Sequence, residues 1–106
     1  MASSKEALAL AKQYDFIHAA LGVHPSEVAD LTEADMDWIR SHASEEKVVA
    51  IGEIGLDYHW DEPEPAVQRK WFLRQIQLAR EVQLPVIIHS RDAAAETMEL
   101  LKETKA

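Results

Sequence analysis

Residues 48–58 read VVAIGEIGLDY, and the rest of the chain is organised around this stretch. It begins as a continuous apolar run, which is typical of a buried strand. The run then presents a carboxylate, Glu53, between Gly52 and Gly55. An unpaired ionised carboxylate in an apolar setting is very costly. We therefore expect a partner for Glu53, such as a cation, a metal ion or water in a cleft.

Apolar patterns on both sides of this strand predict further strands that alternate with helices. The expected elements are a helix over 3–14, a strand over 16–23, a helix over 32–43, the strand around Ile51, a helix over 66–83, a strand over 86–89 and a helix over 93–104. Equivalent strand positions lie about 32 to 36 residues apart, which is the length of a βαβ unit. This alternation predicts an α/β fold with a parallel sheet covered by helices.

Two local patterns refine this outline. Ser3 and Glu6 fit a capping box at the start of the first helix. Gln68 and Gln75 lie two turns apart on one face of the longest helix. These glutamines either contact the loops at the strand ends or lie on a solvated helix edge, and the sequence leaves both interpretations open.

Composition excludes several classes of protein. The chain has 106 residues, enough for one domain with a modest core. It has no cysteine, so a disulfide framework and a thiolate metal site are both excluded. No apolar run approaches the roughly 20 residues that span a bilayer, and residues 1–6 lack the pattern of a signal peptide. We therefore expect a cytoplasmic protein that does not enter a membrane.

The net charge of −8 argues against non-specific nucleic-acid binding, which depends on a basic surface. It does not exclude a metal-dependent phosphodiesterase, because bound divalent ions supply positive charge locally.

Each predicted strand carries a candidate metal ligand or acid–base group near its carboxyl end. His24 follows the first strand, Glu53 lies in the second and His89 ends the third. Ligands of parallel α/β proteins bind beyond the carboxyl ends of the strands, and neighbouring strands lie roughly 5 Å apart. We therefore expect these three side chains to converge. Imidazole with carboxylate suits zinc, manganese or iron, and additional oxygen ligands favour manganese or magnesium. The loops at the same end contribute Asp57, Tyr58, His59, Trp60, Ser90, Arg91 and Asp92.

Each of these residues also has a purely structural interpretation. His24 can simply end a strand, and Glu53 can form a structural ion pair with Arg91. His89 can be a core histidine with satisfied hydrogen bonds. The joint pattern favours a site, because three coincidences at one sheet edge are less probable than any one of them.

Four blocks of sequence carry a resemblance to a known family. They are GVHP at 22–25, IGEIGLDY at 51–58, QRKWFLRQ at 68–75 and LPVIIHSRDA at 84–93. Together they resemble the TatD family of metal-dependent deoxyribonucleases, which belongs to the amidohydrolase-like group of TIM barrels. The resemblance runs from about residue 5 to the end of the chain.

The resemblance implies an enzyme that hydrolyses DNA phosphodiester bonds with a divalent metal. The metal would be magnesium, manganese or zinc, with one or two ions in the complete protein. By the same analogy Glu53 and His89 are metal ligands. Glu53, His24 and Arg91 are then the catalytic residues, with His24 near the substrate and Arg91 in contact with a phosphate.

Some parts of the family pattern do not occur in these 106 residues. The family's first strand carries a His-x-His pair, which this sequence lacks, and its later strands supply a further histidine and an aspartate. A (β/α)₈ barrel needs roughly 200 residues or more. We therefore expect residues 1–106 to form a single partial barrel domain, without the first strand and the C-terminal half. Such a piece would bind metal weakly, lack normal nuclease activity and associate through its open sheet edges.

Two other functions remain open, because a fold does not set a function. One is a metal-dependent hydrolase of small esters or amides on the same fold. The other is a non-catalytic half-barrel that serves as a structural or interaction module.

Overall fold

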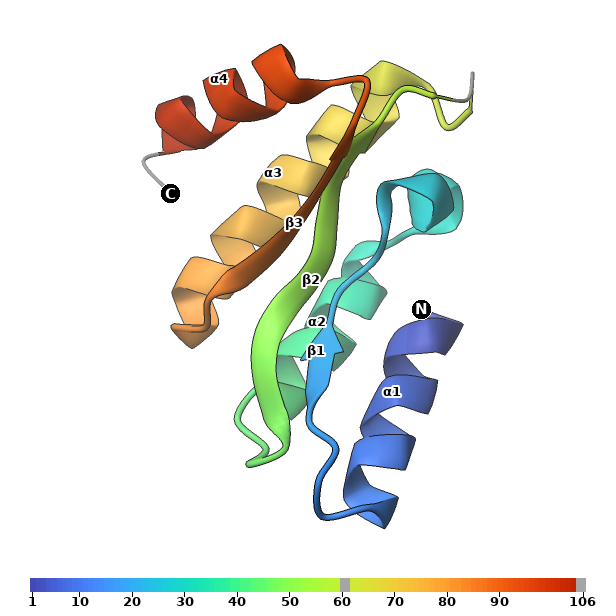
Figure 1. Cartoon of the computed structure of the whole chain (residues 1–106), viewed down its shortest axis with the longest axis vertical. Coiled ribbons are helices and arrows are strands. Elements are labelled where there is room, and N and C mark those ends of the chain that lie inside the picture. The colour runs from blue at the N-terminus through green and yellow to red at the C-terminus, as the bar shows by residue number, and fades with distance from the viewer. Residues whose placement is uncertain (60–61, 105–106) are drawn as a thin grey trace.

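The computed structural model describes residues 1–59 and 62–104, and it contains a parallel sheet flanked by helices (Figure 1). In chain order the described elements are α1 (Ala2–Gln13), β1 (Ala19–Leu21), the 3₁₀ helix η1 (Pro25–Asp30), α2 (Glu33–His42), β2 (Val48–Asp57), α3 (Pro65–Val82), β3 (Val86–Arg91) and α4 (Ala94–Thr104). The predicted order, a helix followed by three strand-plus-helix units, is confirmed. The sequence reasoning did not anticipate η1.

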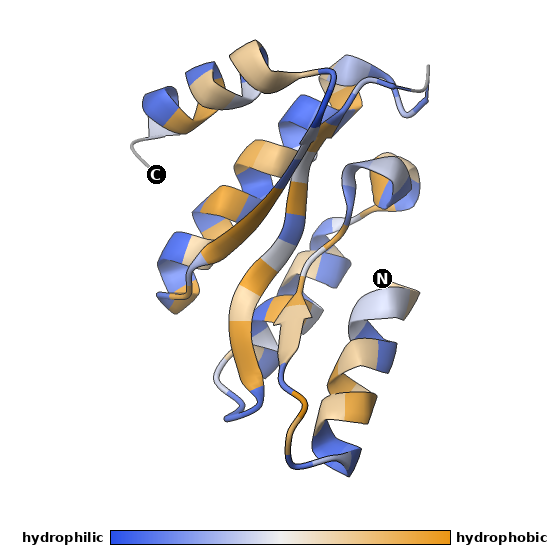
Figure 2. Ribbon diagram, viewed as in Figure 1, coloured by the Kyte–Doolittle hydropathy of each residue, from blue (hydrophilic) through white to orange (hydrophobic). Residues whose placement is uncertain are grey.

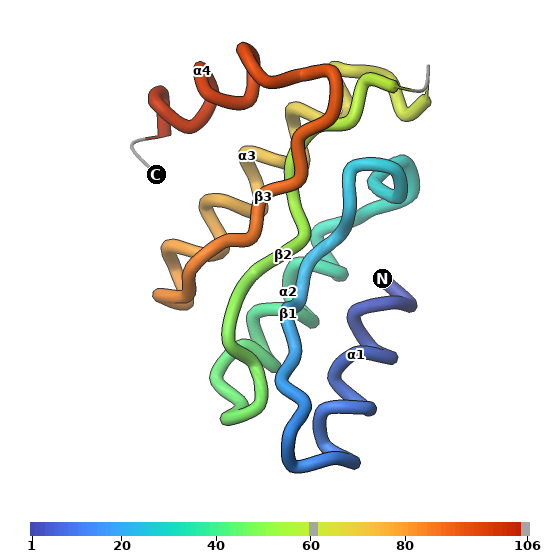
Figure 3. Tube along the Cα trace, in the orientation of Figure 1, coloured from blue at the N-terminus to red at the C-terminus, as the bar shows by residue number. Residues whose placement is uncertain are grey.

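The sheet has the order β1-β2-β3, and both pairings are parallel. The long strand β2 lies between the other two (Figure 3), pairing with β1 from Val48 to Ile51 and with β3 from Ile51 to Asp57. Helices α2 and α3 lie behind the sheet, whereas α1 lies beside β1 (Figure 1). The register places Gly55 opposite His89 and Asp57 opposite Arg91. The carboxyl ends of β2 and β3 therefore meet at one edge.

Buried apolar side chains of the strands, α2 and α3 belong to one core cluster. Figure 2 shows the apolar segments of the strands and helices in orange. The apolar face of α3 contains Trp71, Phe72, Ile76 and Ala79, all of which are buried. Each large side chain that is fully buried contributes about 1.5–3 kcal/mol. In the described part of the chain, no helix combines the length and the hydrophobicity needed to cross a bilayer.

Strand β1 is shorter than predicted, covering three residues instead of 16–23. Phe16 and His18 are exposed, and the Ile17 N–H donates to the carbonyl of Tyr14 in a turn. Beyond the strand, the backbone of Val23 bonds to a side chain of α3 instead of a neighbouring strand. The apolar pattern therefore corresponds to a partly buried segment in which only three residues pair with a neighbouring strand.

The capping box predicted at Ser3 and Glu6 is wrong. Helix α1 begins at Ala2, with Met1 as its N-cap and no side-chain cap. The nearby buried serine, Ser4, has a different role. Its hydroxyl donates to the Gly22 carbonyl over 2.6 Å and accepts from the Gly22 N–H over 3.0 Å. The first turn of α1 thus satisfies backbone groups beside β1.

Candidate functional site

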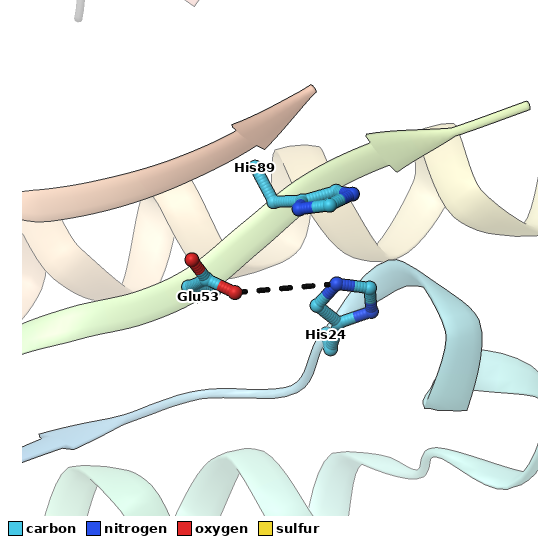
Figure 4. A group of neighbouring side chains, drawn as sticks. All are labelled: His24, Glu53 and His89. Carbon is cyan, nitrogen blue, oxygen red and sulfur yellow. Dashed lines mark ion pairs between the residues drawn. The ribbon is translucent and has the colours of Figure 1, made fainter. Parts of the chain in front are cut away.

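The three side chains that were expected to converge lie together above the sheet (Figure 4). One ligand atom from each of His24, Glu53 and His89 lies within 4.8 Å of the others. The two imidazole rings have centroids 4.3 Å apart, and His24 Nε2 lies 4.0 Å from Glu53 Oε1. Because each residue comes from a different strand or strand end, the parallel sheet itself builds the cluster.

Glu53 does not lie in an apolar interior, which corrects the expectation drawn from its strand. Its side chain is 52% exposed, whereas Ile54 beside it is fully buried against the helices. Within the described residues its ion-pair partner is His24 and not Arg91. The carboxylate therefore keeps its hydration on the open side of the sheet and can accept a cation there.

Gly55 allows β3 to approach β2 closely beside this cluster. Its φ of +147° lies in a region that side chains rarely adopt, and an added Cβ would run into the His89 carbonyl oxygen. The absence of a side chain at this position therefore lets His89 lie directly opposite Gly55, two residues after Glu53.

Hydrogen bonds to Nδ1 determine which ring nitrogen of His24 carries the proton. The backbone N–H of Ser26 donates to His24 Nδ1 over 3.1 Å, and the Ser26 hydroxyl lies 2.8 Å from the same nitrogen. Since Nδ1 accepts, the neutral ring carries its proton on Nε2. That proton faces Glu53. His24 therefore presents a hydrogen-bond donor, whereas a metal ligand needs a lone pair.

His89, unlike His24, carries its proton on the nitrogen that faces away from the cluster. Its Nε2 lies 3.0 Å from Asp57 Oδ2, and an ionised carboxylate only accepts, so Nε2 carries the proton. Figure 4 shows the ring with one nitrogen toward Glu53 and His24 and the other turned away. The nitrogen that faces the cluster is therefore a lone-pair donor suited to a cation.

Asp57 is buried, and each of its two carboxylate oxygens accepts a hydrogen bond. Its Oδ1 accepts the His59 N–H over 3.0 Å, and its Oδ2 accepts from His89. Burial alone would raise the pKa of this carboxyl, but the hydrogen bonds from His59 and His89 outweigh that effect. They hold the pKa of Asp57 below its usual range, with a smaller contribution from the charge of Arg91.

Two buried glutamines of α3 hold the strand ends that carry these side chains. Gln75 Oε1 accepts the Val23 N–H over 2.7 Å, and its Nε2 donates to the Val23 carbonyl. Gln68 Oε1 accepts the Asp57 N–H over 2.8 Å, and its Nε2 donates to the Asp57 carbonyl. Of the two interpretations left open for these glutamines, contact with the strand ends is confirmed.

The structure places the remaining predicted residues around this cluster. Arg91 is exposed at the end of β3, opposite Asp57 in the sheet register. His59 Nδ1 lies 3.4 Å from Asp92 Oδ2. Tyr58 donates to Glu96 at the start of α4. Trp60, which was expected in the loops at this end of the sheet, lies outside the described residues.

The donor set fits a divalent cation. Glu53 offers a half-exposed carboxylate, and His89 offers an imidazole lone pair that Asp57 has already oriented. Carboxylate with imidazole suits zinc, manganese or iron, and water ligands extend the choice to magnesium. Sequence reasoning missed the hydrogen bonds of Asp57 and Ser26. Their only sequence signals were an aspartate four residues after Glu53 and a serine two residues after His24.

Comparisons with known proteins agree on one family. The model of the family described as "TatD related DNase" matches residues 1–106. A metal-dependent hydrolase of Bacillus subtilis strain 168, YabD, is 51% identical over 100 residues, which cover 94% of this chain and 39% of that protein. The 3'-5' ssDNA/RNA exonuclease TatD of Cronobacter sakazakii is 40% identical over 98 residues, covering 92% of this chain and 37% of that protein.

A solved structure gives the same result. The crystal structure of YjjV, a TatD homologue from Escherichia coli K12, superposes with a TM-score of 0.86 at 36% identity, covering 93% of this chain and 39% of that one. The chain thus spans less than two-fifths of the length of these proteins. The match over the whole chain, together with the shared fold, shows that it belongs to the TatD related DNase family.

Proposed function

We propose that Glu53 and His89 belong to the divalent-metal site of a hydrolase that cleaves phosphodiester bonds in DNA. The observation that carries this proposal is the convergence of a carboxylate and an imidazole from two neighbouring parallel strands with a second imidazole from the segment after β1. The names of the relatives, metal-dependent hydrolase and 3'-5' ssDNA/RNA exonuclease, support it.

We also propose that residues 1–106 form one part of a larger (β/α)₈ barrel. The three described strands are parallel, and each outer strand has one neighbour within the described residues. The share of the relatives that the chain spans, 37% and 39% in the two named here, supports this reading. The metal ligands that the family places on other strands would then come from the rest of the barrel.

In this proposal Glu53 and His89 hold the cation, which is magnesium, manganese or zinc, as one or two ions. When bound, the cation lowers the pKa of a coordinated water and balances charge on the phosphoryl oxygens. His24 donates its Nε2–H to a phosphate oxygen, because its Nδ1 is already occupied by Ser26. Arg91, exposed at the end of β3, adds a positive charge for the phosphate backbone.

The site must supply this positive charge locally, because the chain as a whole is acidic. A net charge of −8 does not attract a polyanion. Nucleic acid is therefore held by the cation and Arg91, which makes binding as well as cleavage depend on metal. A cytoplasmic location and self-association through the outer strands remain predictions from the sequence.

The test is cleavage of an end-labelled single-stranded DNA with manganese by the complete barrel protein that contains residues 1–106, compared with its Glu53→Gln variant; residues 1–106 alone are expected to lack normal activity. We expect cleavage that requires manganese and is lost in the variant, which keeps the size of the side chain and removes its charge. An aryl ester and an amide serve as competing substrates. If the protein cleaves these in a manner that depends on Glu53 and leaves DNA intact, the nuclease proposal is wrong.

A further inference from the structure

We propose that Asp57 is a positioning residue that fixes the tautomer and orientation of His89, so that Nδ1 keeps its lone pair toward Glu53. This inference rests on the proposed metal site for its purpose. Its geometry stands on hydrogen bonds among the described residues alone. A carboxylate behind a ligating imidazole is a general means of orienting a metal site.

The first step concerns the two oxygens of Asp57. Oδ1 accepts the backbone N–H of His59 over 3.0 Å, and Oδ2 accepts from His89 Nε2 over 3.0 Å. The Asp57 side chain is only 7% exposed, so water cannot readily replace either partner. Each carboxylate oxygen therefore has one fixed donor, and rotation of the carboxylate would break at least one of these hydrogen bonds.

The second step concerns the backbone that carries this carboxylate. Gln68, 1% exposed, accepts the N–H of Asp57 and donates to its carbonyl over 3.0 Å. The same amide donates to the Pro63 carbonyl over 2.7 Å. Helix α3 thus holds Asp57 from behind, while His59 and His89 hold it from the front. The position of the carboxylate is set before any cation arrives.

The third step follows from chemistry at Oδ1. The His59 N–H requires an acceptor, so the amide in Asp57→Asn keeps its oxygen toward His59. Its NH₂ group then faces His89 Nε2, which must accept. The proton of His89 moves to Nδ1, and the lone pair toward Glu53 is lost. An almost isosteric substitution therefore inverts the tautomer, as loss of the carboxylate does in a catalytic triad.

The experiment records ¹⁵N spectra of the imidazoles in the metal-free protein at about pH 8, where an ordinary imidazole is neutral. His89→Gln assigns the His89 signals. We expect the Nε2–H form of His89 in the wild type and the Nδ1–H form in Asp57→Asn. The control is Tyr58→Phe, which removes the neighbouring hydrogen bond to Glu96 and leaves His89 untouched.

Manganese affinity, measured by calorimetry, is the second readout. We expect Asp57→Asn to weaken binding by about 10–100-fold and Tyr58→Phe to leave it unchanged. The inference is overturned if wild-type His89 carries its proton on Nδ1, a result that requires no variant to fold. It is also overturned if Asp57→Asn changes neither the tautomer nor the affinity. A wild type with the expected tautomer that binds no manganese would refute the metal site and leave the positioning by Asp57 intact.

Discussion

Replacing Gln75 by leucine tests how firmly α3 holds the strand end before His24. In the native protein the Gln75 amide accepts the Val23 N–H over 2.7 Å and donates to the Val23 carbonyl over 3.3 Å. It also donates to the Trp71 carbonyl over 3.2 Å. Gln75 and Val23 are each 1% exposed, so water does not take over these bonds in the variant.

The expected loss of stability follows from the backbone N–H and carbonyl of Val23, which both lose their hydrogen-bond partner in the variant. A buried polar group without a hydrogen bond costs about 1–3 kcal/mol, so two cost about 2–6 kcal/mol. Leucine fills a similar volume and returns part of this through apolar burial. We expect a net loss of about 3 kcal/mol, which lowers the folding equilibrium constant about a hundredfold or more.

Urea unfolding followed by tryptophan fluorescence measures this loss, with the slope m checked for a change in the unfolded state. Gln77→Leu is the matched control, because Gln77 is exposed on the same helix. We expect it to change stability by less than about 0.5 kcal/mol. If Gln75→Leu costs no more than Gln77→Leu, the amide does not hold Val23 and the reasoning fails.

Two further predictions concern the carboxyl end of β2 and the residue that follows it. Gly55→Ala should destabilise the protein by about 3 kcal/mol or more, because the new Cβ runs into the His89 carbonyl at a strained φ; a loss below about 1 kcal/mol in urea unfolding would contradict this close approach. Burial, followed by the bond to Glu96, raises the pKa of Tyr58. Its stabilising effect is therefore complete below the unfolded pKa of about 10 and is lost as the pH rises through the folded value. Urea unfolding from about pH 9 to about pH 11 should show this decline in the wild type and less of it in Tyr58→Phe, and equal declines would refute the assignment.

Much of the site could be predicted from the sequence because strand ends of a parallel sheet meet at one edge. Placing His24, Glu53 and His89 at three such ends was enough to bring them together. The same reasoning could not predict that Asp57 reaches His89. That contact depends on the irregular register between Gly52 and Ile54, which sets which residues of β2 face β3.

The exposure of Glu53 was predicted wrongly for a related reason. Its strand reads as buried because one face packs on α2 and α3, but Glu53 points to the other face. The position of the His24 proton could not be predicted from the sequence either. It depends on η1, whose first turn aims the Ser26 N–H at Nδ1, and the strand pattern gave no sign of that turn.

Manganese binding to single-site variants tests the central claim most directly. The claim is that Glu53 and His89 hold the cation, whereas His24 is a donor to the substrate. Calorimetry should show that Glu53→Gln and His89→Gln each weaken manganese binding by about tenfold or more, and that His24→Gln stays within about twofold of the wild type. Equal losses for His24→Gln and His89→Gln, or an unchanged affinity for Glu53→Gln, would contradict it.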